Sequence, residues 1–448
     1  MNRPILSSSR GREQASAFIL VLWIATGLVS VALLFGSSML FQYRIADNTT
    51  MGYQSDQTVQ GALQYATYVL SSLEKPGMLP EEGAYAYEEV PLGDFYFWFL
   101  NRPPEQTQTQ TVVYGLIDEA SKLNLNTATQ EMLEGLPNMT PELAAAIIDW
   151  RDEDEDVTDG GAESQVYLMN DPPYNCKNAP FGSIFELRLV YGFTDELLFG
   201  EDSNLNGLLD PNENDGVASH PNDNQNGVLE PGILNYVTVF SKEPTTDADG
   251  EARINITSTE DDSLSELLQE ILGEERGNQV GQNAGEDVGS LLEFYMGSGM
   301  TAEEWDQVED HLTVSDEAAE GLVNINTASA EVLACLPGMD ESLAQQILAA
   351  RQADPTLLNS LAWVTTVLDE TVAAEVGPYI TSRSYQCLAD IVSVRQDSKG
   401  YRRSWFVIDT SGEEPVIRYR MDFTGFGWAL PEEVRTSLTM AQAQENKR

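Results

Sequence analysis

Lysine, histidine and cysteine are scarce in this sequence. The 24 basic residues include only six Lys and stand against 72 acidic residues, which gives a formal net charge of -48. Such a charge repels polyanions at long range and argues against nucleic acid as a partner. It suits cation binding, a saline habitat or simple solubility, and composition does not separate the three. Cys176, Cys335 and Cys387 have no CxxC spacing, which argues against zinc and leaves open one disulfide or three buried thiols.

Motifs of common enzyme classes are also missing. Neither of the two His, His220 and His311, lies in a metal-binding or catalytic-triad pattern. GxSxG, HExxH, GxxxxGK[ST] and GxGxxG are all absent. Among 72 acidic residues, a pair of carboxylates says little about acid–base chemistry. We therefore expect a protein that is not an enzyme.

One segment near the N-terminus has no charged residue. It covers 17–41, long enough for the roughly 20 apolar residues of a spanning helix. Three Arg and one Glu precede it, so the positive-inside bias predicts a cytoplasmic N-terminus and a translocated remainder. Apolar residues then recur at three- and four-residue steps up to Leu73, just before Pro76 and Gly77. The pattern predicts one continuous helix over 16–74, with a plain anchor followed by a separate helix as the alternative.

Strand patterns lie on both sides of a long helical region, which predicts an α+β fold. The strand-like runs, rich in aromatic and β-branched residues, are 93–102, 111–119, 384–394, 403–410 and 415–424. PPEQTQTQ, between the first two, is a predicted hairpin loop, and good turns separate the last three. Between them, from 122 to 376, the patterns are mostly helical. We therefore expect one sheet whose strands are interrupted by a large helical domain.

These patterns divide the chain into six parts. In order, they are a basic leader (1–15), the transmembrane part of the N-terminal helix (16–42), its continuation with the first strands (43–121), an inserted helical domain (122–376), the C-terminal strands (377–426) and a polar, frayed tail (427–448). The inserted domain holds two repeated modules, at 122–195 and 322–376, and two loops within 202–233.

The repeated modules are predicted helix-hairpin-helix units. LNLNTATQEMLEGLPNM, from Leu123, returns 200 residues later as VNINTASAEVLACLPGM. In the first copy Thr127 is a candidate N-cap, with Gln130 three residues on to complete a capping box. Thr140 and Pro141 then start the second helix as N-cap and first helical residue.

This type of module is often met in DNA-binding proteins, so the two functions must be weighed. A DNA-binding hairpin needs glycines that let backbone N–H groups reach a phosphate, with basic residues beside them. The first hairpin has no Gly, and Asp340 stands in the turn of the second. An acidic run, Asp152 to Asp156, follows the first copy directly. We therefore interpret the repeats as packing modules rather than a DNA clamp.

A loop at 202–213 matches the EF-hand calcium pattern at every defined position. Side-chain oxygens stand at positions 1, 3, 5, 9 and 12, Gly207 allows the sharp turn at position 6, and position 7 offers its carbonyl. The predicted ligands are Asp202, Asn204, Asn206, Leu208, Asp210 and Glu213. We expect one structural Ca2+ here, with an ion-free turn rich in Asn and Gly as the alternative.

A second loop, 222–233, repeats the pattern in part. It begins with Asn rather than Asp, and position 12 is Ile233, so we expect weaker binding. Its candidate ligands are Asn222, Asn224, Asn226, Val228 and Glu230. In both loops the ion would act structurally, because its binding free energy holds a polar loop that cannot bury itself.

The N-terminus resembles that of type IV pilins and pseudopilins, in which a short basic leader is cut just before the apolar helix. The cut would fall between Ala15 and Ser16, or between Gly11 and Arg12. Most pseudopilins carry Glu at the fifth mature position, where the first of these cuts places Leu20. The chain therefore resembles protein K of type II secretion, the minor pseudopilin that typically lacks this Glu. DEASKLNLNTA, DPPY, FELRLVYG and the order of strands and helical insert also resemble its pattern.

This resemblance implies a pilin-like antiparallel sheet under the long helix, and an insert with two helix-hairpin-helix, or SAM-like, repeats. It implies cleavage by a prepilin peptidase, a methylated N-terminus, a single pass through the inner membrane and a mostly periplasmic chain. It also implies packing with I- and J-like minor pseudopilins at the tip of a short pseudopilus that supports export across the outer membrane. Leu20 suits a tip subunit, because the family's Glu contacts the N-terminal amine of the subunit above.

Two other functions remain open from the sequence. The same anchor with two hairpins fits a membrane-bound DNA receptor of the competence type. The calcium loops fit a calcium-dependent, adhesin-like surface protein. Duplex binding at low salt would favour the receptor, and failure to bind pilin-like helices would favour the adhesin.

Overall fold

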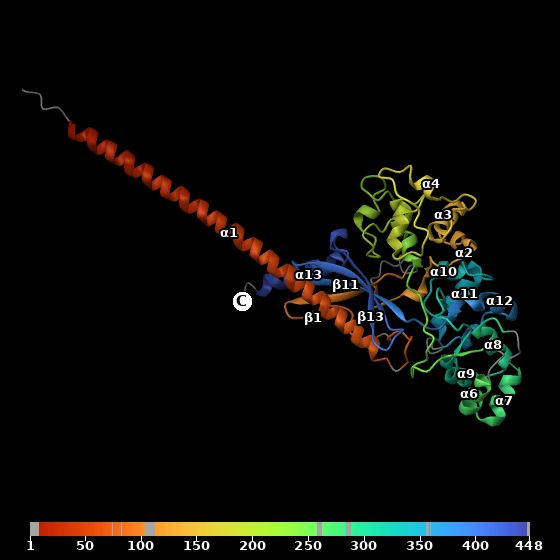
Figure 1. Cartoon of the computed structure of the whole chain (residues 1–448). Coiled ribbons are helices and arrows are strands. Elements are labelled where there is room, and N and C mark those ends of the chain that lie inside the picture. The colour runs from red at the N-terminus through yellow and green to blue at the C-terminus, as the bar shows by residue number, and fades with distance from the viewer. Residues whose placement is uncertain are drawn as a thin grey trace, which may run out of the picture. The chain divides into compact units, whose positions relative to one another are not determined.

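One long helix opens the part of the chain that the structure describes. This computed structural model describes residues 9–445 apart from 74, 82, 104–112, 258–261, 284–287, 355–357 and 359 (Figure 1). Helix α1 (Ser9–Ser71) is continuous, and from Phe18 onward it is long and apolar enough to cross a membrane. The prediction of one continuous helix is thus confirmed, and the alternative of two helices is wrong. The chain forms two compact units, Met1–Gln57 and Thr58–Arg448.

An antiparallel sheet in the second unit joins strands from both ends of the chain. The strands are β1 (Val90–Leu92), β2 (Phe95–Asn101), β3 (Val113–Tyr114), β4 (Ile117–Asp118), β11 (Gln386–Arg395), β12 (Arg402–Asp409) and β13 (Val416–Asp422). The order is β1-β2-β11-β12-β13, with β3 beside β2 and β4 beside β11. Phe99 of β2 stands opposite Ile391 of β11. The predicted interruption of the sheet by an insert is therefore confirmed, although the predicted loop PPEQTQTQ lies almost wholly outside the described residues.

Both faces of the sheet are covered, which explains the unbroken aromatic run of β2. Phe97 and Phe99 pack in one core with apolar residues of α1. These residues follow one helical face at three- and four-residue steps and are Val59, Ala62, Leu63, Ala66 and Leu70. Trp98 and Leu100 point to the other face, where they pack with Leu430 and Leu438. A strand buried on both faces needs apolar residues at every position rather than at alternate ones.

The predicted frayed tail is wrong over most of its length. Residues 432–445 form helix α13 (Glu432–Glu445), and Leu438 is buried against the sheet. The helix presents few apolar residues, so its sequence has no clear period. The open face of β2 and β11 gives these residues a surface to cover, and that surface exists only in the folded sheet.

The insert between β4 and β11 combines short helices with paired short strands. Its α-helices are α2 (Gln130–Glu134), α3 (Pro141–Arg151), α4 (Ser164–Tyr167), α5 (Asp195–Phe199), α6 (Ser263–Leu272), α7 (Glu274–Asn283), α8 (Leu291–Ser298), α9 (Ala302–Val308), α10 (Ala330–Ala334), α11 (Glu341–Ala353) and α12 (Glu370–Val376). Its strands are β5 (Leu123–Asn124), β6 (Val237–Thr238), β7 (Ile254–Asn255), β8 (Leu312–Thr313), β9 (Val323–Asn324) and β10 (Ile380–Thr381), paired β5–β6, β7–β8 and β9–β10, all parallel.

Two of the contacts made by residues shared between the repeats recur in both copies. In the first, the side chain of Asn124 accepts a hydrogen bond from the Asn126 amide at 2.9 Å. Arg151, at the end of α3, donates to the Ala128 carbonyl at 2.7 Å. In the second, Arg351 donates to the Ala328 carbonyl at 2.6 Å. The shared Arg therefore ties the second helix to the entry loop of its own module, while the helix-hairpin-helix classification stays a prediction.

The N-caps of the repeats differ in part from those predicted. Helix α2 is capped by Thr129, whose hydroxyl accepts from the Met132 amide at 3.3 Å, so the capping box of Thr127 and Gln130 is wrong. Thr140 caps α3, with Pro141 in its first turn, as predicted. Asp340, which the sequence marks only as an obstacle to phosphate, caps α11 by accepting from the Leu343 amide at 2.8 Å.

The structure decides between one disulfide and three buried thiols. Cys176, Cys335 and Cys387 are all free thiols and all buried. Burial raises the pKa of Cys335 to about 12, so this thiol stays protonated and unreactive at neutral pH. Three buried thiols, rather than one disulfide with a free thiol, describe the chain.

A buried ion pair connects the sheet to the insert. Arg403 of β12 donates to both carboxylate oxygens of Asp390 on β11, at 2.9 and 2.7 Å. Neither side chain is exposed to solvent. Arg102, at the end of β2, lies 3.5 Å from the same carboxylate. The Arg403 guanidinium also donates to the carbonyls of Asn204, at 2.6 Å, and Leu205, both in the first predicted calcium loop.

Substitution of Arg403 tests this connection. In Arg403→Leu the buried Asp390 loses both hydrogen bonds from Arg403 and keeps only Arg102, 3.5 Å away, so we expect the free energy of unfolding to fall by about 3–5 kcal/mol. Arg418→Leu is the matched control, because Arg418 pairs with Asp409 at 2.7 Å from a side chain that is 56% exposed. An exposed pair contributes roughly 0–1 kcal/mol. Urea unfolding of the purified full chain gives both values, and equal losses in the two variants would contradict the assignment.

Candidate metal centre

The first predicted calcium loop folds around Asp202. This side chain is 1% exposed, and its two oxygens accept from the amides of Asn206 and Gly207, both at 2.9 Å. Leu205 and Gly207 have positive φ, 53° and 71°. Two left-handed residues so close together turn the chain sharply, which brings the oxygens of positions 1, 3 and 5 to the inside of the loop.

Two other predicted ligands of this loop converge on a third, Asp210. The side-chain amides of Asn204 and Asn206 both donate to Asp210 Oδ2, at 2.8 and 3.0 Å. Glu213 closes the loop, because its oxygens accept from the amides of Asp210 and Ser203, both at 3.1 Å. Leu208, whose carbonyl is the predicted ligand at position 7, is half-buried. The side chains of positions 3, 5 and 9 thus meet at Asp210 Oδ2, and Glu213 at position 12 holds the backbone of the loop.

Burial leaves the acids of this loop poorly solvated. It raises the pKa of Glu213 to about 8, and the negative charge of Asp202 adds to the effect. Burial also raises the pKa of Asp202, although Arg102 and Arg403 oppose the shift. A cation among these oxygens would favour their charged forms. The donor set, all oxygen and partly buried, fits a hard cation such as Ca2+.

The second predicted loop has the same turn. Gln225 and Gly227 have positive φ, 56° and 77°. The side-chain amides of Asn224 and Asn226 both donate to Glu230 Oε1, at 2.8 and 3.0 Å, as their counterparts donate to Asp210 in the first loop. Asn222, at position 1, is exposed, and the Val228 amide donates to Asn226 Oδ1 at 2.7 Å. Ile233, at position 12, is buried and offers no side-chain oxygen.

Glu201 makes the hydrogen bond that a carboxylate at position 12 would make in the second loop. Its carboxylate accepts from the amides of Asn224 and Glu230, at 3.3 and 3.1 Å, which are positions 3 and 9 of the second loop. The amide of position 9 is also the one that donates to Glu213 in the first loop. Sequence reasoning missed Glu201, because the EF-hand pattern is searched within twelve consecutive residues and Glu201 precedes Asn222 by 21. A backbone bridge between Gly200 and Pro231 brings it there.

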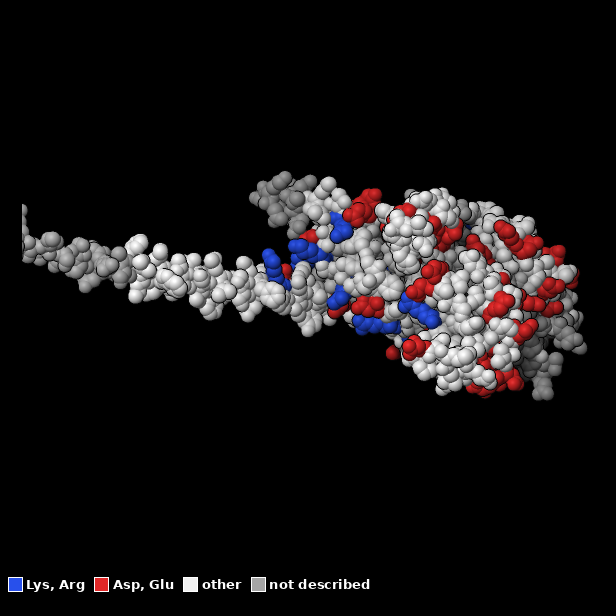
Figure 2. Space-filling model, turned by 90° about the horizontal axis from the view of Figure 1, so that it is seen from above, with Lys and Arg blue, Asp and Glu red and all other residues white. Residues whose placement is uncertain are grey.

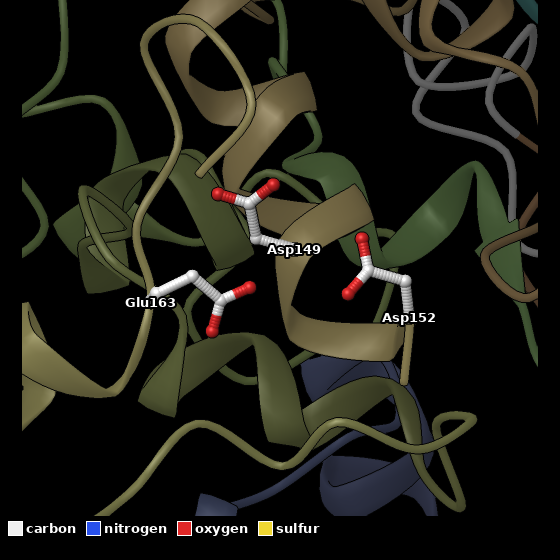
Figure 3. Close-up of side chains that lie close together, drawn as sticks. All are labelled: Asp149, Asp152 and Glu163. Atoms are coloured by element: carbon white, nitrogen blue, oxygen red, sulfur yellow. The ribbon is translucent and has the colours of Figure 1, made fainter. Parts of the chain in front are cut away.

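A third acidic group lies at the end of the first repeat. Asp149 in the last turn of α3, Asp152 just after it and Glu163 place carboxylate oxygens within 4.8 Å of one another. Figure 3 shows Glu163 facing the two aspartates from the loop that leads into α4. Burial, followed by the charge of Asp149, raises the pKa of Glu163 to about 7.

Sequence reasoning interpreted this acidic run only as a barrier to phosphate. The one available signal is the spacing from Asp152 to Glu163, which equals that between positions 1 and 12 of an EF-hand loop. Val157 occupies position 6, where the pattern requires Gly, so a motif search rejects the segment.

The predicted processing residues lie in the first turns of α1. Gly11, Arg12, Ala15 and Ser16 all fall inside the helix, and residues 1–8 of the predicted leader lie outside the described residues. Leu20, at the position of the usual pseudopilin Glu, is 61% exposed. The neighbouring apolar side chains of α1 are exposed as well, so this part of the helix has an apolar surface that no described residue covers.

The surface charge agrees with the composition. Figure 2 shows Asp and Glu spread over much of one face, with few Lys or Arg among them. In the repeats, Arg151 and Arg351 bond backbone carbonyls rather than forming a basic surface. A DNA phosphate would meet acidic side chains at the exit of the first repeat and Asp340 at the turn of the second.

Comparison with known proteins finds one family in two segments of the chain. Models described as type II secretion system (T2SS), protein K, match residues 117–199 and 323–369. No curated protein sequence matches the chain. Among solved structures, a chain of the GspK-GspI-GspJ complex from the type 2 secretion system of enterotoxigenic Escherichia coli aligns with a TM-score of 0.38 and 13% identity, covering 84% of this chain and 96% of that one.

The two matched segments begin at β4 and β9, and they contain the two repeats. The two segments therefore cover most of the residues that the repeats share. The first segment also covers the loop that follows the first repeat and the acidic group of Asp149, Asp152 and Glu163. The competence-type alternative receives no support from these matches. The chain belongs with protein K of the type II secretion system, and is a minor pseudopilin of that kind.

Proposed function

We propose that this minor pseudopilin occupies the tip of a short pseudopilus and caps it with its inserted domain. The observation that carries the proposal is Leu20, which places an exposed apolar side chain where pseudopilins within a filament need a carboxylate. A subunit with nothing above it has no amine for that carboxylate to contact. An unpaired carboxylate in lipid would only add an energetic cost.

The partners that we propose are other minor pseudopilins, I- and J-like, packed against α1. From 18 to 41 the helix carries no charged residue, and its large apolar side chains are exposed. Lipid and the apolar helices of partner subunits are the two environments that suit such a surface. The basic residues before it favour a cytoplasmic N-terminus, with a prepilin peptidase removing the leader at Ala15 or Gly11 and the bulk of the chain in the periplasm.

Introducing the missing carboxylate tests the tip position. In Leu20→Glu, a tip subunit would hold an unpaired Glu in the membrane, at a cost of up to about 3 kcal/mol. We expect less co-purification with pilin-like partners from native membranes and reduced secretion. Leu20→Ile, which keeps an apolar side chain of similar size, is the control and should behave as wild type. Equal or stronger assembly with Glu at this position would show that an amine lies above it, which contradicts the tip position.

We further propose that two Ca2+ ions hold the loops 202–213 and 222–233 as structural ions. The first would take Asp202, Asn204, Asn206, Asp210, Glu213 and the Leu208 carbonyl. The second would take Asn222, Asn224, Asn226, Glu230 and the Val228 carbonyl. Glu201 would serve the second loop as the carboxylate that position 12 lacks, since it already accepts from the amides of positions 3 and 9.

Removing the ions should destabilise the full chain. Saturation at 100 times the dissociation constant adds about 2.7 kcal/mol per site, so EDTA should lower the melting temperature. Asp202→Ala should remove part of this calcium-dependent gain, and Glu201→Gln a separate part. Glu266→Gln, an exposed acid on α6, is the matched control and should keep all of it. A melting curve that EDTA leaves unchanged would count against both loops, and full calcium stabilisation in Glu201→Gln would count against Glu201 alone.

A further inference from the structure

We propose that a cavity between the sheet and the two repeats binds an organic carboxylate with a small apolar body. The cavity has a volume of about 210 Å³. It is lined by residues from the end of β2, from the segment that joins β4 to β5, and from the second repeat. None of its described lining residues belongs to the loops 202–213 and 222–233, so it is a separate site.

Arg102 lines this cavity and has no hydrogen-bond acceptor among the described residues. Its side chain is 6% exposed, and its Nε is buried without a partner. Asp390 lies 3.5 Å away, but both of its oxygens already accept from Arg403. Arg102 Cζ lies 4.6 Å from the centroid of the Trp405 ring, which covers one face of the guanidinium. The N–H groups at its edge therefore lack the planar acceptor that they are shaped to bind.

A second cation that lines the cavity, Lys122, is also short of acceptors. Its Nζ donates to Glu119 Oε1 at 2.9 Å, and its side chain is 11% exposed. An ammonium group carries three N–H donors, and the described residues offer Lys122 only this one acceptor. The two remaining donors are available to a ligand.

Asp118, the acid among the described lining residues, has no acceptor capacity left. It accepts from the Ala120 amide and from the side chains of Ser384, Asn324 and Thr327. The two oxygens of a carboxylate offer about four acceptor positions, and these four bonds use them. Of the charged groups described around the cavity, only the cations therefore lack partners. The ligand must supply acceptors, and a carboxylate supplies them in the geometry that a guanidinium matches.

The apolar lining residues set the rest of the ligand. Leu79, Leu116, Ile117 and Val332 contribute apolar surface to the cavity. An apolar cavity of about 150 Å³ holds benzene, so the larger volume here has room for a carboxylate beside a group of that size. Benzoate and short branched aliphatic acids fit this description. A free acid and the C-terminal residue of a polypeptide would both present this chemistry.

The net charge of the chain does not exclude an anion at this place. A nucleic acid would have to lie along the acidic surface, whereas a small carboxylate meets only the groups of one cavity. Exposed charges further apart than about 8 Å are largely screened at physiological ionic strength, so Arg102 and Lys122 dominate locally. Burial lowers the pKa of Arg102. A carboxylate beside the guanidinium would favour its charged form.

A ligand in this cavity would contact three parts of the chain at once. Arg102 directly follows β2, Lys122 directly precedes β5 of the first repeat, and Val332 lies in α10 of the second. The bound carboxylate would therefore hold the second repeat to the sheet. If it is the end of a polypeptide, that polypeptide would be attached where the insert meets the sheet.

Isothermal titration of the purified full chain in detergent tests the charge requirement. Sodium benzoate should bind, and benzamide, which has the same ring without the charge, should bind about tenfold more weakly or worse. Inorganic phosphate, an anion without an apolar body, should also bind more weakly than benzoate. Arg102→Met should weaken benzoate binding about tenfold or more. Arg418→Met is the matched control, because this exposed Arg lies outside the cavity, and it should bind benzoate as wild type does.

A second variant covers the case in which Arg102→Met does not fold. Leu79→Trp keeps every charge but fills part of the cavity, so it should lose benzoate binding while its melting temperature without ligand shows it folded. Equal affinity for benzoate and benzamide would overturn the proposal. So would unchanged benzoate affinity in Leu79→Trp, or no benzoate binding to folded wild type, which would leave the cavity to water.

Two peptides distinguish the sources of the carboxylate. Acetyl-Gly-Gly-Leu with a free C-terminus is titrated beside the same peptide with a C-terminal amide. Tighter binding of the free-terminus peptide than of benzoate would assign the site to the end of a polypeptide. Weaker binding of that peptide than of benzoate would assign it to a free acid. Equal binding of the peptide and its amide, both tighter than benzoate, would contradict the carboxylate requirement.

Discussion

The ion pair between Asp390 and Arg403 is the contact on which the arrangement of the second unit depends. It joins the neighbouring strands β11 and β12, and the same guanidinium donates to two backbone carbonyls of the loop 202–213. Such a pair stabilises a fold only while all its hydrogen bonds are made, because both charges are removed from water. The insert is therefore firmly attached to the sheet, because two carbonyls of its loop 202–213 accept hydrogen bonds from Arg403, which is buried in the sheet.

A second buried acid connects the sheet to the second repeat. Asp118 of β4 accepts from the side chains of Asn324 and Thr327, at 2.9 and 2.5 Å, and from Ser384 just before β11. Burial raises its pKa, while these hydrogen bonds act against the shift. The strands on both sides of the insert thus share one polar centre with the second repeat. The shared Asn of the repeats is used here for packing rather than for binding a nucleic acid.

The proposed calcium binding would give the acidic composition of the insert a structural use. Its polar loops bury little apolar surface, so chain packing alone gives them little stability. Carboxylates gathered in such loops repel one another until a cation binds, and the binding energy then holds the loop. Asp202 lies near Glu213 in the loop 202–213, and Glu201 lies near Glu230 in the loop 222–233, so both loops gather carboxylates in this way. If the chain caps a pseudopilus as proposed, calcium in these loops would make the cap more rigid.

The sequence by itself determined the features that depend on neighbouring residues. The continuous helix α1, the strands on both sides of the insert, the N-cap Thr140 and the sharp turns at Gly207 and Gly227 all follow from local spacing and backbone preference. Only the tertiary structure decided which distant residues meet. It placed Glu201 beside the second loop, gathered Glu163 with Asp149, and gave α13 a sheet face to cover. These contacts depend on how the chain folds back on itself, and a local pattern carries no record of that path.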